Sequence, residues 1–467
     1  MSIKYKQKLL FILKKRQKLD AKSEIYVGLS TGLYNSVKFI HDMLGNIGSD
    51  IIESKMYIAN DNNDIDREVT KYKPTHVIIE ALWVVPEKFK ILEKLHPHVK
   101  WIIRLHSELP FIAGEGIAMK WIGEYCKYNN IIIACNSPRM LQEIRYYVSC
   151  ILNIKTTSIN NKVIYLPNYY PKDYKTKPFR FNDYNNYINK INEEINIKDN
   201  MNNENKNNQE NMNNENMNNQ ENNENNKNNN KNKNKKRLKS RFLNCFKKSN
   251  NLYIVDKEEG KERKEEGRER KEEGKHNTEE DNIINIGCFG AVRPLKNHLI
   301  QAISAIKFAN SINKKLYFHI NCDRHEMNGL PAYHNLVGLF DQLSETGHKL
   351  VLHEWCDHDE FLLLCSKMDI GLQVSFTETF NIVSADLITM GVPIVASNEL
   401  PWVSELYSSN PVDSSSIYDK LCLTYYNPDD NVKRNIEGLS KYVDNTKDIW
   451  DKYFYIESQY GSFTSYI

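Results

Sequence analysis

A long tract near the middle of this 467-residue chain has almost nothing from which to build a hydrophobic core. Residues 201–230 contain 18 asparagines, and two eleven-residue units, 201–211 and 212–222, differ at a single position. A second repeat, KEEGKER followed by KEEGRER and KEEGK, begins at Lys257. Ordering a backbone costs about 1–2 kcal/mol per residue, and a tract with so little apolar surface cannot offset that cost. The sequence therefore predicts a low-complexity, disordered insertion at 181–281.

The remainder of the chain is long enough for two ordinary domains. No run approaches the roughly 18 apolar residues that span a bilayer. The only apolar run in the first segment, 1–20, is at 9–13 between lysines, shorter than the about 7–15 residues of a secretory signal. We therefore expect a cytoplasmic protein without a transmembrane segment. Its basic first segment is expected to lie outside the first domain, with a weak amphipathic surface helix as the alternative.

Nine cysteines are spread along the chain without a CxxC pair, which is typical of a reducing compartment and argues against zinc. The segment 353–358, HEWCDH, is rich in ligand-type side chains but matches no zinc spacing. We interpret it as a strand end followed by a helix cap, with Asp357 and Glu360 as a capping box. The triplet from Asp357 to Asp359 also has the form of a metal-binding DxD, but we favour the capping role and expect no metal.

A basic stretch inside the insertion, 231–248, includes Phe242 and Phe246 among its lysines and arginines. This pattern suits a nucleic-acid-binding patch or a nuclear address. Charge runs in solvated linkers have the same composition. We favour the linker and expect no strong nucleic-acid partner.

Both flanks of the insertion alternate short apolar runs with helical periodicity. Strands are expected at 25–29, 76–80, 99–106, 130–134 and 163–166, then at 283–288, 316–321, 350–353, 370–376 and 393–397, with helices near 297–310, 332–346, 358–367 and 380–390. This alternation predicts an α/β chain with two doubly wound parallel sheets, each a Rossmann-like domain. Ligands of such sheets bind beyond the carboxyl ends of the strands, so we expect the site in a cleft between the two domains.

The stretch 371–397 carries the densest set of candidate site residues. An alternating strand ends at a turn that contains Glu378, and a helix then begins near Phe380, where its free amide groups can hold an anion. Asp386 follows among apolar neighbours, where an acid is costly without a partner. That partner is either a hydroxyl-bearing ligand or an internal salt bridge or cap, and the spacing alone does not choose between them.

A second group of candidate site residues lies near the start of the same half of the chain. A strand ends near Gly287 and Gly290, and Arg293 and Lys296 follow just before a helix. Two cations at a strand end beside a helix start form a phosphate-binding pattern, although ordinary surface cations have the same spacing. The acid-lined strand end in the same half strengthens the phosphate interpretation.

These residues resemble the donor-domain motifs of the group-one, retaining glycosyltransferases with the GT-B fold. Glu378 and Asp386 match the family's E-x7-E pair, and the glycine–proline strand start follows at 391–397. Arg293 and Lys296 resemble its arginine and lysine.

The first half carries two further motifs in the family's order. Pro167-Asn168 resembles the proline–asparagine motif before the interdomain linker, and His106 resembles the strand-end histidine that faces the transferred sugar. The resemblance covers nearly all of the chain outside the insertion, and the insertion falls at the linker, where extra length has a small entropic cost.

The resemblance implies an acceptor-side domain at 21–180, a nucleotide-sugar donor domain at 282–430, and a helical segment at 431–467 that packs back on the domains. It implies an enzyme that moves a sugar from a nucleotide-diphosphate sugar to an acceptor with retention of anomeric configuration. The acceptor, whether glycan, lipid, protein or small molecule, is not identified. No cofactor or metal is implied, because two cations and a helix start can replace a metal.

The same resemblance assigns roles to residues. Arg293 and Lys296 would neutralise the diphosphate as it leaves, Glu378 would contact the donor sugar, Asp386 would bind the ribose hydroxyls, and His106 would contact the sugar from the opposite domain. No protein nucleophile is implied. The remaining donor-binding candidates are Gly290, Thr379, Phe380, Asn381 and Ile382.

Three residues of the first half are candidates on the acceptor side. Gly32 lies in a loop that is either a backbone-lined cleft edge or a plain strand–helix turn. Glu80 ends a strand near Trp83, where an acid and a ring can hold a sugar, or where Trp83 simply packs. Glu115 lies in the loop after His106, which is expected to line the cleft.

The sequence departs from the family at three points. The second acid is Asp386 and not glutamate, Asn381 stands where glycine is usual, and the spacing between Arg293 and Lys296 is short. A catalytically silent GT-B protein that binds nucleotide sugars or partners is therefore the alternative function, and nucleic-acid binding through 231–248 is a third.

Overall fold

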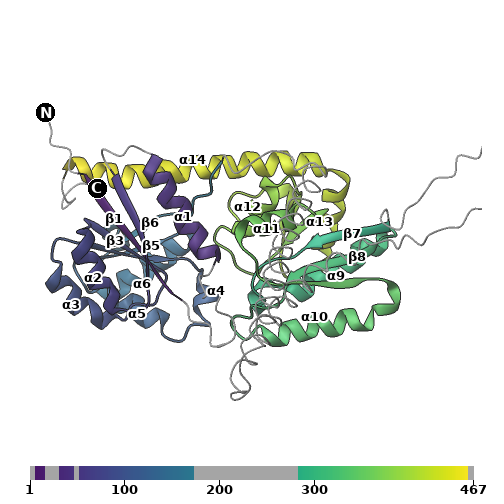
Figure 1. Cartoon of the computed structure of the whole chain (residues 1–467), viewed down its shortest axis with the longest axis horizontal. Helices are drawn as coiled ribbons and strands as arrows, with labels where there is room; N and C mark the ends of the chain where they lie inside the picture. The colour runs from purple at the N-terminus through teal and green to yellow at the C-terminus, as the bar shows by residue number, and fades with distance from the viewer. Residues whose placement is uncertain (1–5, 16–30, 47–51, 173–281, 461–467) are drawn as a thin grey trace, which may run out of the picture. The chain divides into compact units, whose positions relative to one another are not determined.

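The computed structural model describes residues 6–15, 31–46, 52–172 and 282–460. These ranges hold two parallel β-sheets with helices around them (Figure 1). Each sheet has six strands, and the described strand pairings are all parallel. The prediction of two doubly wound parallel sheets is confirmed. The insertion predicted at 181–281 lies outside the described residues.

The first sheet has the strand order β2-β1-β3-β4-β5-β6. Its strands are β1 (Gln7–Lys14), β2 (Ile52–Ala59), β3 (His76–Glu80), β4 (Lys100–Leu105), β5 (Ile131–Cys135) and β6 (Val163–Tyr165). The helices of this half are α1 (Thr31–Asn46), α2 (Asn63–Tyr72), α3 (Phe89–Leu95), α4 (Leu109–Ile112), α5 (Ala118–Tyr125) and α6 (Pro138–Leu152). Strands β3 to β5 are mostly apolar and buried, as parallel strands are when both faces are covered.

The N-terminal segment corrects an expectation. Gln7–Lys14 is strand β1, inside the sheet between β2 and β3, and neither a segment outside the first domain nor a surface helix. Leu9 to Leu13 are at most 1% exposed. A continuous apolar run of this length is the pattern of a parallel strand buried on both faces. The strand expected at 25–29 lies outside the described residues.

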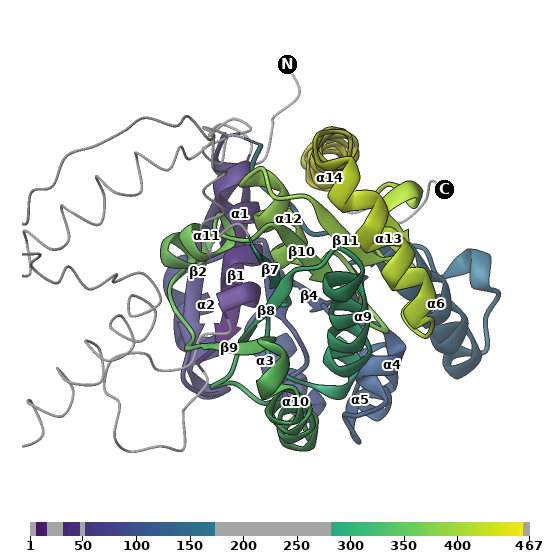
Figure 2. The same ribbon diagram turned by 90° about the vertical axis from the view of Figure 1, so that its right-hand side faces the viewer.

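The second sheet has the order β12-β11-β10-β7-β8-β9. Its strands are β7 (Ile283–Gly287), β8 (Lys315–Asn321), β9 (Lys349–His353), β10 (Ile370–Gln373), β11 (Ile394–Ser397) and β12 (Ser408–Ser409). The helices are α9 (His298–Ser311), α10 (Leu330–Gln342), α11 (His358–Cys365), α12 (Ile382–Thr389) and α13 (Ser414–Tyr426). Helices α9 and α13 lie side by side (Figure 2), with Phe308 packed edge-on against Tyr425.

Two predicted helix starts are confirmed by their caps. Ser137 precedes α6 and its side chain accepts a hydrogen bond from the Met140 amide, with Pro138 in the first turn. Asp357 precedes α11 and accepts from the Glu360 amide at 2.9 Å. The segment 353–358 is therefore a strand end followed by a helix cap.

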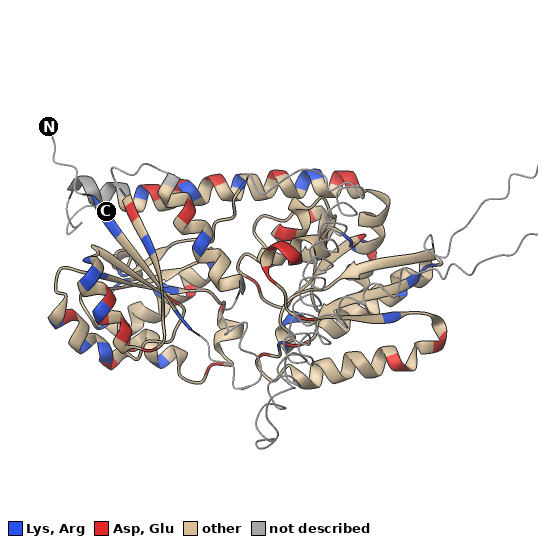
Figure 3. Cartoon of the chain, in the orientation of Figure 1, with Lys and Arg blue, Asp and Glu red and all other residues tan. Residues whose placement is uncertain are grey.

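The last helix, α14 (Pro428–Tyr460), contacts apolar clusters of both sheets. Leu439 and Val443 pack with residues around α12, and Trp450 and Phe454 pack with β1. The indole of Trp450 also donates to the Pro167 carbonyl at 3.0 Å. Charged residues lie mostly on helices such as α14 and on loops, while most strand positions are uncharged (Figure 3). A charged residue inside a strand, such as Arg104 in β4, therefore needs an explanation.

Candidate active site

The carboxyl ends of β7 and β10 bring the predicted phosphate-binding cations to the predicted acid. A short 3-10 turn, Pro294–Lys296, follows β7, and the Phe376 amide after β10 donates to the Leu295 carbonyl at 3.0 Å. The side-chain Nδ2 of Asn297 donates to the Val374 carbonyl at 3.0 Å and provides a second link between the same two segments. These two contacts place the Lys296 side chain beside Glu378.

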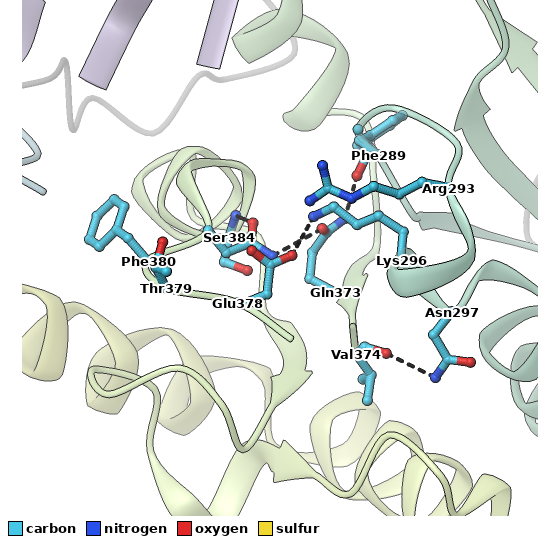
Figure 4. Close-up of polar contacts among 12 residues, drawn as sticks. Phe289, Arg293, Lys296, Asn297, Gln373, Val374, Glu378, Thr379, Phe380 and Ser384 are labelled. Atoms are coloured by element: carbon cyan, nitrogen blue, oxygen red, sulfur yellow. Dashed lines mark hydrogen bonds and ion pairs between the residues drawn. The ribbon is translucent and has the colours of Figure 1, made fainter. Parts of the chain in front are cut away.

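Lys296 and Glu378 form a buried ion pair, with 2.6 Å between Nζ and Oε1 (Figure 4). Their side chains are only 11% and 9% exposed. Burial alone would raise the pKa of the Glu378 carboxyl, but the charges of Lys296 and Arg293 outweigh burial and hold that pKa below its ordinary value. Glu378 is therefore an anion at neutral pH that faces two cations.

Gly290 allows this arrangement. Its φ of +117° favours glycine, and a Cβ built on it would lie 3.4 Å from Cε of Lys296. Its amide donates to Oδ1 of Asn321, at the end of the neighbouring strand β8, at 2.9 Å. The backbone after β7 thus packs directly against the lysine side chain, and Gly290 shapes the space in which Lys296 lies.

Arg293 reaches toward the same side as Lys296 in Figure 4. Its guanidinium lies 3.1 Å from Glu326 and 4.9 Å from the centre of the Phe111 ring. Arg324 contacts the other oxygen of Glu326 at 2.5 Å, so two arginines share one carboxylate. Sequence reasoning missed Arg324 and Glu326, although both follow the carboxyl end of β8, where the same rule about strand ends applies.

The turn before α12 explains the unusual Asn381. Asn381 has a φ of +55°, in the left-handed region, which glycine adopts freely and asparagine tolerates better than most residues. Its Oδ1 also accepts from the Ser384 amide at 3.1 Å and caps the helix. Asn381 thus adopts a conformation that glycine could also adopt, and it adds a cap.

The neighbouring donor-side candidates lie in the same turn but differ in surroundings. The Phe380 ring is buried with Trp402 and Tyr442, and its carbonyl accepts from the Trp402 indole at 2.8 Å. Ile382 is half-buried and begins α12. Gly32, in the first turn of α1, lies opposite it, since a Cβ on Gly32 would be 3.9 Å from Cγ2 of Ile382.

Asp386 is buried and already engaged. Its Oδ1 accepts from the Tyr170 hydroxyl at 2.9 Å and is 2.8 Å from Nε2 of His358. Burial would lower the pKa of His358, but the hydrogen bond and charge of Asp386 raise it above the ordinary value. Asp386 therefore has an internal partner, which the sequence analysis gave as the alternative to a ligand hydroxyl. His358 was missed as that partner because it lies 28 residues away in the sequence.

His106 lies at the end of β4 and is held by a buried network. Its Nε2 contacts Oε2 of Glu80, which also lies 3.2 Å from NH1 of Arg104. Arg104 is fully buried and donates to the carbonyls of Leu166 and Pro167 and, at 2.6 Å, to Oδ1 of Asn168. The proline–asparagine motif thus anchors the arginine that orients Glu80.

The protonation of this network follows from its charges. Burial raises the pKa of Glu80, but Arg104 and His106 outweigh it, so the carboxyl titrates below its ordinary pKa. Burial and the nearby Arg104 lower the pKa of His106. A neutral His106 facing a carboxylate carries its proton on Nε2, which leaves Nδ1 as an acceptor. Glu80 is therefore the residue that orients His106.

The other first-half candidates lie as follows. Trp83 is half-buried and packs against the first apolar core, which agrees with its packing interpretation. Glu115 is exposed between α4 and α5. The preceding helix α4 reaches the second half through Phe111, whose ring lies 4.9 Å from the Arg293 guanidinium.

The turn with Glu378 also contacts the carboxyl ends of β4 and β5. Thr379 Oγ1 accepts from Nδ2 of Asn136 at 3.2 Å and donates to the His106 carbonyl at 3.4 Å. Thr379 thus connects Glu378 with His106, two residues whose roles the resemblance assigned to opposite sides of one sugar. Asn136 was missed, although it directly follows β5 and lies two residues after the end of the strand predicted at 130–134.

The structure matches solved structures of one fold class. It matches the sucrose-phosphate synthase (tll1590) from Thermosynechococcus elongatus with a TM-score of 0.52 and 10% identity, over 97% of this chain and 99% of that chain. The apo structure of OtsA matches with a TM-score of 0.56 and 9% identity, over 99% and 100%. An alpha,alpha-trehalose 6-phosphate synthase from Burkholderia multivorans matches with a TM-score of 0.54 and 9% identity, over 97% and 96%.

The two six-stranded sheets and these matches define the chain as a protein of the GT-B fold, as the sequence resemblance predicted. No protein-family model matches the sequence, and no curated protein matches it either. Among the helices that the structure describes, none is long and apolar enough to cross a membrane. In the same described ranges, no group of three or more His, Cys, Asp or Glu side chains could hold a metal ion.

Proposed function

We propose that this protein is a glycosyltransferase that moves a sugar from a nucleotide-diphosphate sugar to an acceptor. The observation that carries the proposal is the convergence of Arg293, Lys296 and Glu378 at the carboxyl ends of β7 and β10. Ligands of doubly wound sheets bind at such strand ends. The GT-B fold, shared with named sugar-transferring synthases, supports the same reaction class.

The reaction follows from the charges. The bond between the sugar carbon and the diphosphate oxygen breaks, and the leaving nucleoside diphosphate gains negative charge. Arg293 and Lys296 are preorganised to stabilise that charge, because Glu326 and Glu378 hold them in place before the donor arrives. The acceptor hydroxyl oxygen bonds to the sugar carbon, and its proton passes to the leaving diphosphate or to water. We propose retention of configuration from the family resemblance, without a protein nucleophile and without a metal.

Glu378 and His106 would flank the sugar. When Lys296 binds the diphosphate in place of Glu378, the Glu378 carboxylate becomes available to accept hydrogen bonds from sugar hydroxyls. The neutral His106 offers Nδ1 as a further acceptor from the other sheet. Thr379 holds the two strand ends together through the His106 carbonyl.

A donor screen tests the proposal. The purified protein is incubated with UDP-, GDP- and ADP-sugars, and released nucleotide is measured by mass spectrometry. We expect release from at least one donor, with a loss of about 100-fold or more in Lys296→Met and Glu378→Gln. Lys307→Met, which removes an exposed lysine on α9, is the matched control and keeps full activity. Full activity in both site variants would contradict the assignment of Lys296 and Glu378 to the active site.

The second candidate function is a catalytically silent nucleotide-sugar-binding protein. It is favoured by Asp386, which is only 2% exposed and whose Oδ1 is already engaged by His358 and Tyr170, so that the residue proposed to bind the ribose serves as an internal partner. Calorimetric binding of a nucleotide sugar without nucleotide release over hours would favour this second function.

A further inference from the structure

Asn136 is a fully buried residue, and one of its two polar side-chain atoms has no hydrogen-bond partner among the described residues. It directly follows β5 and is 0% exposed. Its Nδ2 donates to Thr379 Oγ1 at 3.2 Å, while its Oδ1 has no hydrogen-bond partner among the described residues. Most buried side-chain oxygens in folded proteins have at least one donor. Asn136 is therefore an exception that needs an explanation.

The orientation of the Asn136 amide follows from its neighbour. The Thr379 hydroxyl has one proton, and it is donated to the His106 carbonyl at 3.4 Å. Thr379 Oγ1 can then only accept, so the amide nitrogen of Asn136 must face it. The oxygen of Asn136 consequently points away from Thr379, to where no donor of the described residues reaches.

The strand order places Asn136 beside His106. Strands β4 and β5 are adjacent, and Leu105 pairs with Cys135, so His106 and Asn136 leave the sheet at the same level. His106 offers Nδ1 as an acceptor, and Glu80 Oε1, behind it, is buried without a hydrogen-bond partner. Two buried acceptors at this sheet edge, Asn136 Oδ1 and Glu80 Oε1, therefore lack donors among the described residues.

A ligand that satisfies such an edge must bring hydrogen-bond donors. Phosphate oxygens are acceptors at neutral pH and would repel these groups, whereas a sugar carries several hydroxyl donors. Thr379, which holds the Asn136 amide, is the residue next to Glu378 in the turn labelled in Figure 4. The ligand part that reaches Asn136 is therefore the one that lies against Glu378.

We propose that Asn136 Oδ1 accepts a hydrogen bond from a hydroxyl group of the transferred sugar and helps to determine which sugar the enzyme accepts. This inference rests on the proposed glycosyl transfer and names a recognition residue for it. A sugar that lacks the hydroxyl, or carries it in the other configuration, leaves Oδ1 buried and unpaired, which is costly.

The test compares dissociation constants by calorimetry. The probes are the best donor from the UDP-, GDP- and ADP-sugar panel and its deoxy analogues at each ring position, with the free nucleoside diphosphate for reference. We expect the wild type to bind one deoxy analogue roughly ten- to a hundred-fold more weakly than the parent. In Asn136→Ala, that ratio falls to about one, while the affinity for the free nucleoside diphosphate is unchanged.

Further variants separate the alternatives. Thr379→Val removes the partner of Nδ2 but keeps Oδ1 of Asn136, so it should retain the discrimination even if affinity falls. Asn136→Leu, of similar volume, replaces Asn136→Ala if the latter does not fold. Asn130→Ala, directly before the first residue of β5 and so beyond its opposite end, is the matched control and leaves every ratio unchanged.

An Asn136 variant that keeps the wild-type ratio at every ring position overturns the inference, as would be the case if a water molecule satisfied Oδ1. If no nucleotide sugar binds at all, the proposed function and this inference fall together, whereas binding with unchanged ratios removes only the inference.

Discussion

Nζ of Lys296 lies 2.6 Å from Oε1 of Glu378, and both side chains are almost wholly buried. The pair joins the first turn after β7 to the turn after β10. An isolated buried charge is costly, so each residue depends on the other for the stability of the folded chain. The same two residues are those to which we assign the donor's diphosphate and sugar.

Removal of one partner of this pair should destabilise the protein more than removal of both. We expect Lys296→Met to lower the free energy of unfolding by about 3 kcal/mol, because Glu378 is left buried without the cation to which it is hydrogen-bonded. The double variant Lys296→Met with Glu378→Leu should recover most of that loss. Urea denaturation of the four proteins in the cycle measures the coupling, and purely additive effects would contradict a direct pair.

Two glycines near Arg293 should respond very differently to alanine. A Cβ on Gly329 would lie 2.0 Å from the backbone oxygen of Val292, whereas a Cβ on Gly114 would lie 2.1 Å from the flexible end of Met327. We expect Gly329→Ala to cost several kcal/mol, because backbone cannot move aside cheaply, and Gly114→Ala to cost less than about 1 kcal/mol. Thermal unfolding gives both values, and equal losses would contradict the packing.

The turn at Asn381 predicts an ordered series of substitutions. Asn381→Gly keeps the left-handed conformation but loses the cap on Ser384, so it should change stability by no more than about 0.5 kcal/mol. Asn381→Ala loses the cap and is strained at a φ of +55°, so it should cost about 2 kcal/mol. Denaturant unfolding ranks the two, and an alanine variant as stable as the glycine variant would contradict this assignment.

The His358–Asp386 contact predicts a pH-dependent contribution to stability. Because the pKa of His358 is raised in the folded chain, its contribution is fully present below the unfolded pKa and is lost as pH rises through the folded pKa. Asp357 and Asp359 also favour the charged imidazole. His358→Gln should therefore lower the melting temperature more at about pH 5.5 than at about pH 8.5. A difference from wild type that is independent of pH would show that His358 is not charged.

The fold could be predicted wherever the local pattern was unambiguous. The strand expected at 76–80 is β3, His76–Glu80, because a continuous apolar run between helical stretches is the pattern of a buried parallel strand. The same pattern at Leu9 to Leu13 was misjudged because lysines flank it. Strand β2, Ile52–Ala59, was missed because it is an edge strand whose middle residues are only half-buried.

The site residues that could be predicted are those that directly follow the end of a single strand. Glu378, Lys296 and His106 each follow a strand, and their positions could be read locally. Their partners Glu326, Asn136 and His358 could not be assigned, because those contacts join segments tens to hundreds of residues apart in sequence. Periodicity and spacing describe neighbours along the chain, and these contacts depend on how the sheets and turns pack.

The most direct test of the account is the binding of a nucleotide-diphosphate sugar to the residues at the ends of β7 and β10. Calorimetry with the donor panel should give a dissociation constant for the wild type that rises at least about tenfold in Lys296→Met and in Arg293→Gln, while Lys307→Met binds as the wild type does. Equal affinity in all four proteins, or no binding of any nucleotide sugar by the wild type, would contradict the central claim.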